Sequence, residues 1–479
     1  MHFPQIGERL RVAPWAFLIV VFLLSLPAVT VRFYASDEIE YFAYLRSMWF
    51  DGDLSFDNEY RYFYDRGIAR GWRFKETFLD GETATGKRFN FAPVGSAILW
   101  SPFYVLADTG VRVSNAIGIP VAADGYSRPY IASVAYASAA YGFLAIALSA
   151  YAASRVIGDG TAATAAALAV WLGTPVLFYM YLAPGFSHAC SAFAVAAFVV
   201  VWLHVRREWS LKGVVALGAA AALMGMVREQ DIFIAVGPAI DFLIFAKRRL
   251  QDGTWRVPGS VMRAAAGAAA VAVCFMPQVL TYDSLFGHAA PSSTVQSKMT
   301  WTSPHTWRVL ASPTNGLLFW TPLALPALIG LVWMGVYRGR FAAGGMNPTE
   351  RRQIALICLV MVMTQIYLGG ALDTWAGAGS FGQRRLVGLT VFFVLGLTAF
   401  LAAIRHHWTK YFGWCLVVLA VWWNLGLMAQ FGAGLMNRQR LDPAENAYHN
   451  FVTIPRQLPA LAHRFLLDRA SFYQRQPPP

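Results

Sequence analysis

The chain has 479 residues, of which 57% are hydrophobic and 14% are charged, whereas an ordinary soluble domain has about 25% charged residues. A soluble protein could not bury so many apolar residues in its core. The composition therefore excludes an ordinary soluble protein and predicts that lipid is part of its surroundings. The net charge of +13 would suggest nucleic acid as the partner of a soluble protein. In a membrane protein the same charge reports topology, and we expect no nucleic acid partner.

The first apolar run covers residues 14–34. It is about one span long, since a span needs about 20 helical residues, and it has no small-residue cleavage site, so we predict a transmembrane helix and not a signal peptide. Similar runs follow it along the chain. We therefore predict an all-α polytopic membrane protein with about 11 spans, at residues 14–34, 129–154, 161–182, 187–205, 212–227, 231–246, 264–283, 316–337, 353–372, 385–404 and 411–432.

Charge is distributed unevenly between the two sides of these spans. With the amino terminus inside, the cytoplasmic connections, which include Arg9, Arg11 and Arg405, carry 17 basic and five acidic residues, whereas the first outer loop (35–128) carries 10 basic and 13 acidic residues. This asymmetry follows the positive-inside rule. If the apolar run 92–108 crossed the membrane, every later loop would change sides. We therefore predict that it forms a half-inserted or surface-lying helix on the outer face.

The spans and loops divide the chain into four segments. We expect a transmembrane module with a large first loop at 1–283, an outer loop at 284–315, a second transmembrane module at 316–432 and an outer tail at 433–479. The four cysteines lie inside apolar runs and have no paired spacing. They indicate neither disulfides nor a metal site.

Carboxylates come directly after the first span, at Asp37 and Glu38, and Tyr41 follows them. A solvated helix end would account for these acids equally well. The stretch continues as an aromatic, amphipathic sequence, which suits a position along the membrane interface beside a lipid head group. We predict that Asp37, Glu38 and Tyr41 belong to a functional site at this interface.

Basic residues on the outer side are candidates for binding a phosphate. Lys87 and Arg88 lead into the half-inserted helix, where they could instead be interfacial anchors. Arg228 lies in a short outer link with Glu229 and Asp231. Guanidinium binds phosphate oxygens bidentately, although a local pair between Arg228 and either acid is the plainer alternative.

A second basic pair, Arg384 and Arg385, opens a span on the outer face, against the charge bias. An anionic ligand would explain two arginines at this place, because the start of a helix also offers free N–H groups. His188 and Asp231 are further candidates for substrate contact; a lone histidine is more often structural. The chain has no zinc-protease, CxxC or nucleotide-binding motif in a suitable context.

Six segments carry a resemblance to a known family: Asp37 to Tyr41, 90–95 (NFAPVG), 153–158 (ASRVIG), Arg228, 312–320 (SPTNGLLFW) and 380–385 (SFGQRR). Together they resemble the GT-C superfamily of membrane glycosyltransferases, in particular the bacterial branch of protein mannosyltransferases and lipid A aminoarabinose transferases. The resemblance implies a catalytic acidic base in the first outer loop, for which Asp37 is the better match, with Glu38 as a second acidic group and Tyr41 as a substrate contact, and a polyprenyl-phosphate sugar as donor. It also implies a bacterial inner-membrane protein with a catalytic module at 1–283, a variable module at 316–432, and a site, a loop (284–315) and a tail (433–479) on the periplasmic side. The pattern at 90–93 (NFAP) departs from that of these branches, so the acceptor stays open.

The sequence therefore predicts an inverting glycosyltransferase that moves a monosaccharide from a polyprenyl phosphate to a glycan, lipid or protein acceptor among the membrane lipids. No cofactor is required, since a base and a phosphate-stabilising group suffice for this reaction, but the carboxylates leave a divalent metal open. The alternative is a transporter or flippase for a lipid-linked or anionic substrate. Transporters usually place ionisable groups within the spans, where this chain has mainly Asp241.

Overall fold

The computed structural model describes residues 14–68, 71, 73–302, 304–377, 379–404 and 406–472. Arg9, Arg11 and Arg405, which contributed to the topology prediction, lie outside these residues. Within the described part of the chain the regular structure is helical, and extended pairing is limited to two isolated bridges, Glu82 with Arg88 and Met299 with Leu372. The prediction of an all-α polytopic membrane protein is confirmed.

Six of the described helices are long and apolar enough to cross a membrane. They are α5 (Arg128–Ile157), α8 (His188–Val205), α11 (Val257–Cys274), α17 (Pro348–Ala371), the continuous pair η6 (Arg384–Leu389) and α18 (Thr390–Ala403), and α19 (His407–Ala433). Shorter helices match the other predicted spans: α1 (Pro14–Ser25) with η2 (Leu26–Ala28), α6 (Gly160–Gly173), α9 (Leu211–Val227), α10 (Val236–Gln251) after η5 (Glu229–Ala235), and α16 (Ala324–Val336).

Prolines interrupt several runs that the sequence suggested as continuous spans. Pro175 separates α6 from α7 (Val176–Tyr181), Pro322 separates α15 (Leu317–Trp320) from α16, and Pro277 lies where α11 gives way to α12 (Met276–Phe286). A proline removes a backbone N–H donor and clashes with the preceding turn. The first span also ends early, because the helix stops at Ala28 and residues 29–35 are not helical, so the predicted end at residue 34 is wrong.

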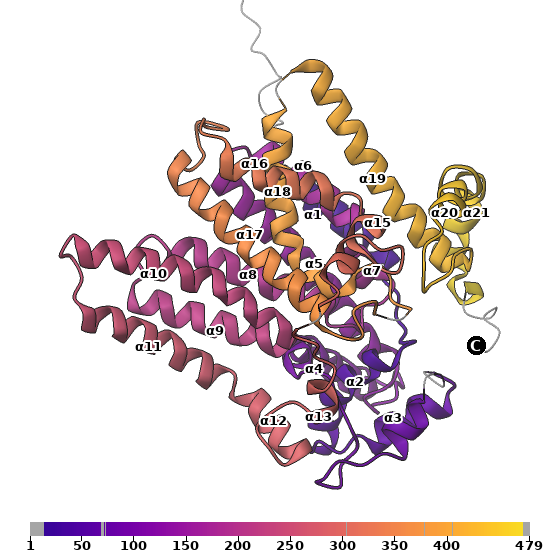
Figure 1. Ribbon diagram of the computed structural model, residues 1–479. Coiled ribbons are helices and arrows are strands. Elements are labelled where there is room, and N and C mark those ends of the chain that lie inside the picture. Colours follow the sequence, from indigo (N-terminus) through magenta and orange to yellow (C-terminus); the bar gives the residue numbers. More distant parts are fainter. Residues whose placement is uncertain are drawn as a thin grey trace, which may run out of the picture.

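Close packing holds the helices of the bundle together. α16 packs against α18, α5 against α8, and α9 lies between α8 and α11 (Figure 1). At the α16–α18 crossing Gly330 faces Gly396, and a Cβ added to Gly330 would lie 1.9 Å from the carbonyl oxygen of Gly396. Only a residue without a side chain permits this approach, which is how helices commonly associate in lipid.

The outer pieces gather at one end of the bundle (Figure 1). The first loop contributes α2 (Ser36–Arg46), η3 (Ser47–Asp51), α3 (Asp57–Asp65), η4 (Lys75–Leu79) and α4 (Gly95–Ala116). The loop 284–315 contains α13 (Ser293–Gln296) and α14 (Thr306–Leu310). The tail forms α20 (Pro443–Tyr448), η7 (His449–Thr453), α21 (Ile454–Leu467) and η8 (Arg469–Phe472).

Helix α4 contains the apolar run whose crossing was in question. Its first residue, Gly95, abuts the backbone of Met226 and Val227 at the outer end of α9. From there Tyr141 of α5 donates to the carbonyl of Leu99 (2.8 Å), and Tyr130, near the start of α5, bonds Asp108 (2.7 Å). α4 thus begins at the end of α9 and lies along the first half of α5. That it does not cross the membrane stays a prediction.

Candidate active site

Helix α2 places two adjacent carboxylates in different surroundings. Glu38, at the third position of the helix, is fully buried, and its Oε2 accepts the N–H groups of Tyr34 (2.8 Å) and Ala35 (3.1 Å), as in a helix cap. Its Oε1 faces Gly185, where an added Cβ would lie 2.8 Å away. Burial raises the pKa of Glu38 to about 8, against the opposing effect of these backbone hydrogen bonds. Glu38 is therefore a neutral, built-in support of α2 near neutral pH.

Asp37, by contrast, keeps 40% of its side chain exposed and forms an ion pair with Arg384, whose Nη1 lies 2.7 Å from Asp37 Oδ2. The Arg384 guanidinium also lies 5.7 Å from the centre of the Phe186 ring. The pair joins the first outer loop to the beginning of the penultimate span. An accessible carboxylate and a guanidinium are thus held side by side.

Arg228 reaches the same place from the outer end of α9. One of its terminal nitrogens contacts His188 Nδ1 at the start of α8 and also donates to the carbonyl of Arg384 (3.3 Å). Next to it, Gln230 donates to the carbonyl of Arg385 (2.8 Å). The short link after α9 is therefore bonded directly to the basic segment 384–385.

Two donors in this group have no partner in the described structure. Arg385 donates from one terminal nitrogen to Thr374, at 3.0 Å from the carbonyl and 2.9 Å from the hydroxyl, but its Nε is buried and unbonded. The Nε2 of His188 is buried and unbonded as well. Leaving a buried polar group unsatisfied costs about 1–3 kcal/mol. Such donors favour a site that is completed by a ligand or by water.

The loop before Arg384 is shaped by contacts with the segment 312–320. Gln383 is buried and donates to the carbonyls of Asn315 (3.1 Å) and Trp375 (3.3 Å), while Asn315 donates to Ser380 (3.2 Å). Gly382 has a φ of +64° and packs against Pro175, so a side chain there would be both strained and crowded. Two of the motifs noted in the sequence thus fix one another and set the direction of Arg384.

Sequence reasoning missed Glu40 and Lys298. Glu40 lies one helical turn after Asp37 and is buried, with its Oε2 accepting the N–H of Phe91 (2.8 Å). Burial, then the negative charge of Asp37, raise its pKa to about 8, and Lys298 of the loop 284–315 lies close enough to oppose that rise. The i, i+3 spacing from Asp37 was the signal that could have revealed Glu40. Nothing in the local sequence pointed to Lys298.

The remaining candidates are placed as follows. Arg88 forms ion pairs with Asp57 (2.9 Å) and Glu82 (3.3 Å), and Lys87 donates to the hydroxyl of Ser284 (2.6 Å). These two basic residues are therefore not part of the cluster of Arg228, Arg384 and Arg385. The Tyr41 hydroxyl accepts from Ser187 (2.9 Å), next to His188.

Asp231 is buried and accepts from Ser191 (2.5 Å), so it does not pair with Arg228. Among the described residues, no three His, Cys, Asp or Glu side chains are grouped as a metal site would require.

Comparison with solved structures adds the fold family. ArnT from Cupriavidus metallidurans, in its apo state, aligns with 95% of this chain and 72% of its own, with a TM-score of 0.52 at 16% identity. The chain has the GT-C fold. The archaeal oligosaccharyltransferase AglB from Archaeoglobus fulgidus, in complex with an inhibitory peptide and a dolichol-phosphate, aligns with 96% of this chain and 56% of its own at 11% identity, but its TM-score of 0.42 is too low to add weight. No family model and no curated protein sequence matches the chain.

The sequence-based resemblance is thus confirmed at the level of fold.

Proposed function

We propose that this chain is an inverting glycosyltransferase, which transfers a monosaccharide from a polyprenyl phosphate to a glycan, lipid or protein acceptor on the periplasmic face of the inner membrane. The observation that carries the proposal is the 2.7 Å ion pair between Asp37 and Arg384, with Arg228 bonded to the same segment. Acid and guanidinium groups from distant stretches meet where a lipid head group would lie.

The reaction needs a base, and Asp37 is the better candidate of the two adjacent acids. Its carboxylate is accessible, whereas Glu38 is buried and, with a pKa of about 8, holds a proton near neutral pH. Asp37 would take the proton of the acceptor hydroxyl while the acceptor oxygen attacks the anomeric carbon. The bond between that carbon and the phosphate oxygen breaks in the same step. A single displacement inverts the anomeric centre, and a positioned base contributes about 10²–10⁴ in rate.

The leaving phosphate gains negative charge as that bond breaks. Arg228, Arg384 and Arg385 offer three guanidinium groups, and among the described residues one ion pair, to Asp37, joins them to a carboxylate. Stabilising charge where it develops is commonly a large term in catalysis. The unbonded Nε of Arg385 and Nε2 of His188 supply two further donors for phosphate or sugar oxygens. These groups can do the chemistry without a metal.

Asp241, the main ionisable residue within the predicted spans, does not support the transporter alternative. Asp241 accepts from Arg206 (3.0 and 3.3 Å), Trp202 (2.9 Å) and Gln353 (2.6 Å), and Arg206 also pairs with Glu350 at the start of α17. An acid so fully bonded is a structural tie between helices and not a free relay group.

The test is sugar transfer in membranes with a labelled polyprenyl-phosphate monosaccharide. We expect Asp37→Asn to lower transfer by at least 10²-fold at normal expression, because the base is lost. The matched control is Glu76→Gln, which neutralises an exposed acid in the same outer loop. Equal transfer by Asp37→Asn and the control would remove Asp37 from the mechanism, and uptake of the lipid without any product would favour the transporter.

A further inference from the structure

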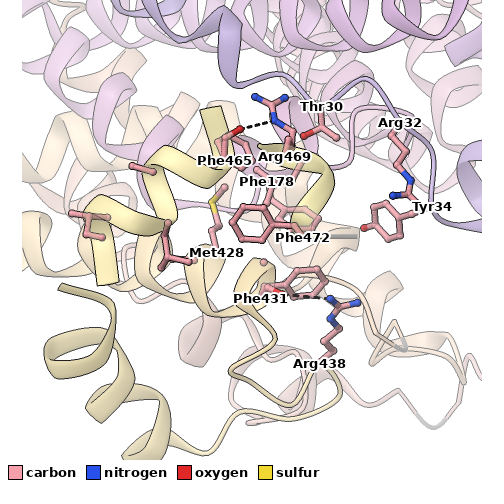
Figure 2. Close-up of a pocket in the computed structure, with 16 residues that line it drawn as sticks. Thr30, Arg32, Tyr34, Phe178, Met428, Phe431, Arg438, Phe465, Arg469 and Phe472 are labelled. Atoms are coloured by element: carbon pink, nitrogen blue, oxygen red, sulfur yellow. Dashed lines mark hydrogen bonds between the residues drawn. The ribbon is translucent and has the colours of Figure 1, made fainter. Parts of the chain in front are cut away.

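A cavity of about 310 Å³ lies next to the candidate active site. It is bounded by the non-helical residues 29–35, the ends of α7 and α19, and α21 (Figure 2). Its volume is at the lower end of the range of ligand pockets, which is about 300–1,000 Å³. Most of its surface is hydrocarbon, and the large apolar side chains include Phe178, Met428, Phe431, Leu461 and Phe465. Such a lining suits an alkyl or prenyl chain.

The tail of the chain forms one wall of this cavity. Leu458, Leu461, Ala462 and Phe465 line it from α21, at the i, i+3, i+4, i+7 spacing of one helical face. After α21, Arg469 donates to the carbonyls of Val29 (2.6 Å) and Pro27 (2.7 Å). The far end of the chain is thereby fastened to the segment that leaves the first span, and the wall is fixed.

The polar part of the lining is basic. Among the residues that the structure describes, the 16 that line the cavity include Arg32, Arg438 and Arg469 but no carboxylate. Figure 2 shows Arg32 beside Tyr34 and Arg438 below Phe431 at the edge of the cavity, and Arg438 is only partly exposed. A guanidinium beside an apolar chamber suits a ligand with a hydrocarbon body and an anionic end.

The cavity also adjoins the candidate active site. Tyr34 lines it and donates its N–H to Glu38. The Tyr34 ring lies 6.2 Å from Phe186, whose ring lies 5.7 Å from the guanidinium carbon of Arg384. One layer of aromatic side chains therefore separates the cavity from the Asp37–Arg384 pair.

We propose that this cavity is a lipid-phosphate site, in which one hydrocarbon chain lies against α21 and the phosphate faces Arg32 and Arg438. The rings of Tyr34 and Phe186 separate it from Arg384, so it is distinct from the phosphate-stabilising arginines, and it makes the tail a part of the substrate-binding structure. Its assignment to a substrate of the transfer reaction rests on the proposed function. Occupancy of the cavity itself is independent of that reaction.

The experiment measures lipid retained by the full-length protein in detergent, by native mass spectrometry, with undecaprenyl phosphate, phosphatidylglycerol and uncharged diacylglycerol as probes. Ala462→Trp, which fills the cavity, should lower retention of a lipid phosphate by at least 10-fold. Leu467→Trp places the same side chain on the exposed side of α21, where Leu467 is 75% exposed, and should leave retention unchanged. Arg438→Gln should reduce the preference for either phosphate over diacylglycerol.

Ala429→Phe narrows the cavity from α19, the opposite wall, and gives a second variant should Ala462→Trp not fold. Retention at the wild-type level in a folded cavity-filling variant would overturn the proposal, as would equal retention of diacylglycerol and phosphates by the wild type. Preference for undecaprenyl phosphate over phosphatidylglycerol would identify a second polyprenyl phosphate beside the donor, and the reverse a phospholipid.

Asp37→Asn should retain lipid and lose transfer. Retention by a wild type that transfers no sugar would leave the cavity site standing and refute the proposed function instead.

Discussion

Replacing Glu38 by glutamine is expected to change how stability depends on pH. Glu38 is fully buried and its pKa is about 8, whereas an unfolded glutamic acid titrates near 4.5. Between these values the folded protein keeps the proton while the unfolded chain releases it, so Glu38 favours folding fully below pH about 4.5 and loses that contribution as the pH rises to about 8. At about 1.4 kcal/mol for each pH unit between the unfolded and the folded pKa of Glu38, this contribution amounts to about 5 kcal/mol.

Glutamine has the same shape, accepts the same N–H groups from Tyr34 and Ala35, and does not ionise. Relative to the wild type, Glu38→Gln should therefore gain thermal stability steadily from pH 5 to pH 8 and no further above it. The measurement is the unfolding temperature of the detergent-purified protein over this range. Glu40 titrates in both proteins and cancels from the comparison. Glu76→Gln, at an exposed acid, is the control and should follow the wild type. Parallel curves for Glu38→Gln and the wild type would refute the assignment of a neutral, buried Glu38.

Three further predictions concern the same region. Arg384→Lys loses the planar fork beside Asp37 and should lower transfer by about 10²-fold or more, with an unchanged unfolding temperature; near-normal transfer would exclude Arg384 from phosphate stabilisation. Gly185→Ala drives a Cβ to 2.8 Å from Glu38 Oε1 and the Phe33 ring and should cost about 1–3 kcal/mol of stability by thermal unfolding, whereas Gly110→Ala, with open space around it, should be close to neutral. Transfer should persist after EDTA treatment of the membranes, and loss that Mg²⁺ or Mn²⁺ restores would show that a metal takes part.

The sequence allowed the apolar helices to be predicted because they depend on local composition, whereas the sidedness stays a prediction. Apolar runs mark helices in lipid, and two arginines at the outer start of a span broke the charge bias strongly enough to single out Arg384 and Arg385. The contact between Arg384 and Asp37 agrees with the expected meeting of distant groups. The catalytic and phosphate-binding roles of these residues stay predictions.

Features that depend on burial or on long-range contacts were beyond the sequence. Glu38 was predicted as a site residue and Glu40 drew no prediction, because the sequence does not reveal that Glu38 packs against Gly185 or that Glu40 accepts the N–H of Phe91. Arg88 read as a ligand-binding residue because the folded loop, which brings Asp57 and Glu82 to it, could not be foreseen. The proline breaks at Pro175 and Pro322 were visible in the sequence, yet the apolar composition around them outweighed the signal.

The partnership of Asp37 with Arg384 links residues 347 positions apart. During synthesis the first outer loop is made long before the penultimate helix. Asp37 therefore lacks its partner Arg384 until nearly the whole bundle has been inserted. A chain truncated before the penultimate helix would contain Asp37 but not Arg384, so the pair could not form. Under the proposed function, a site that needs both residues would therefore become active only after the penultimate helix has docked.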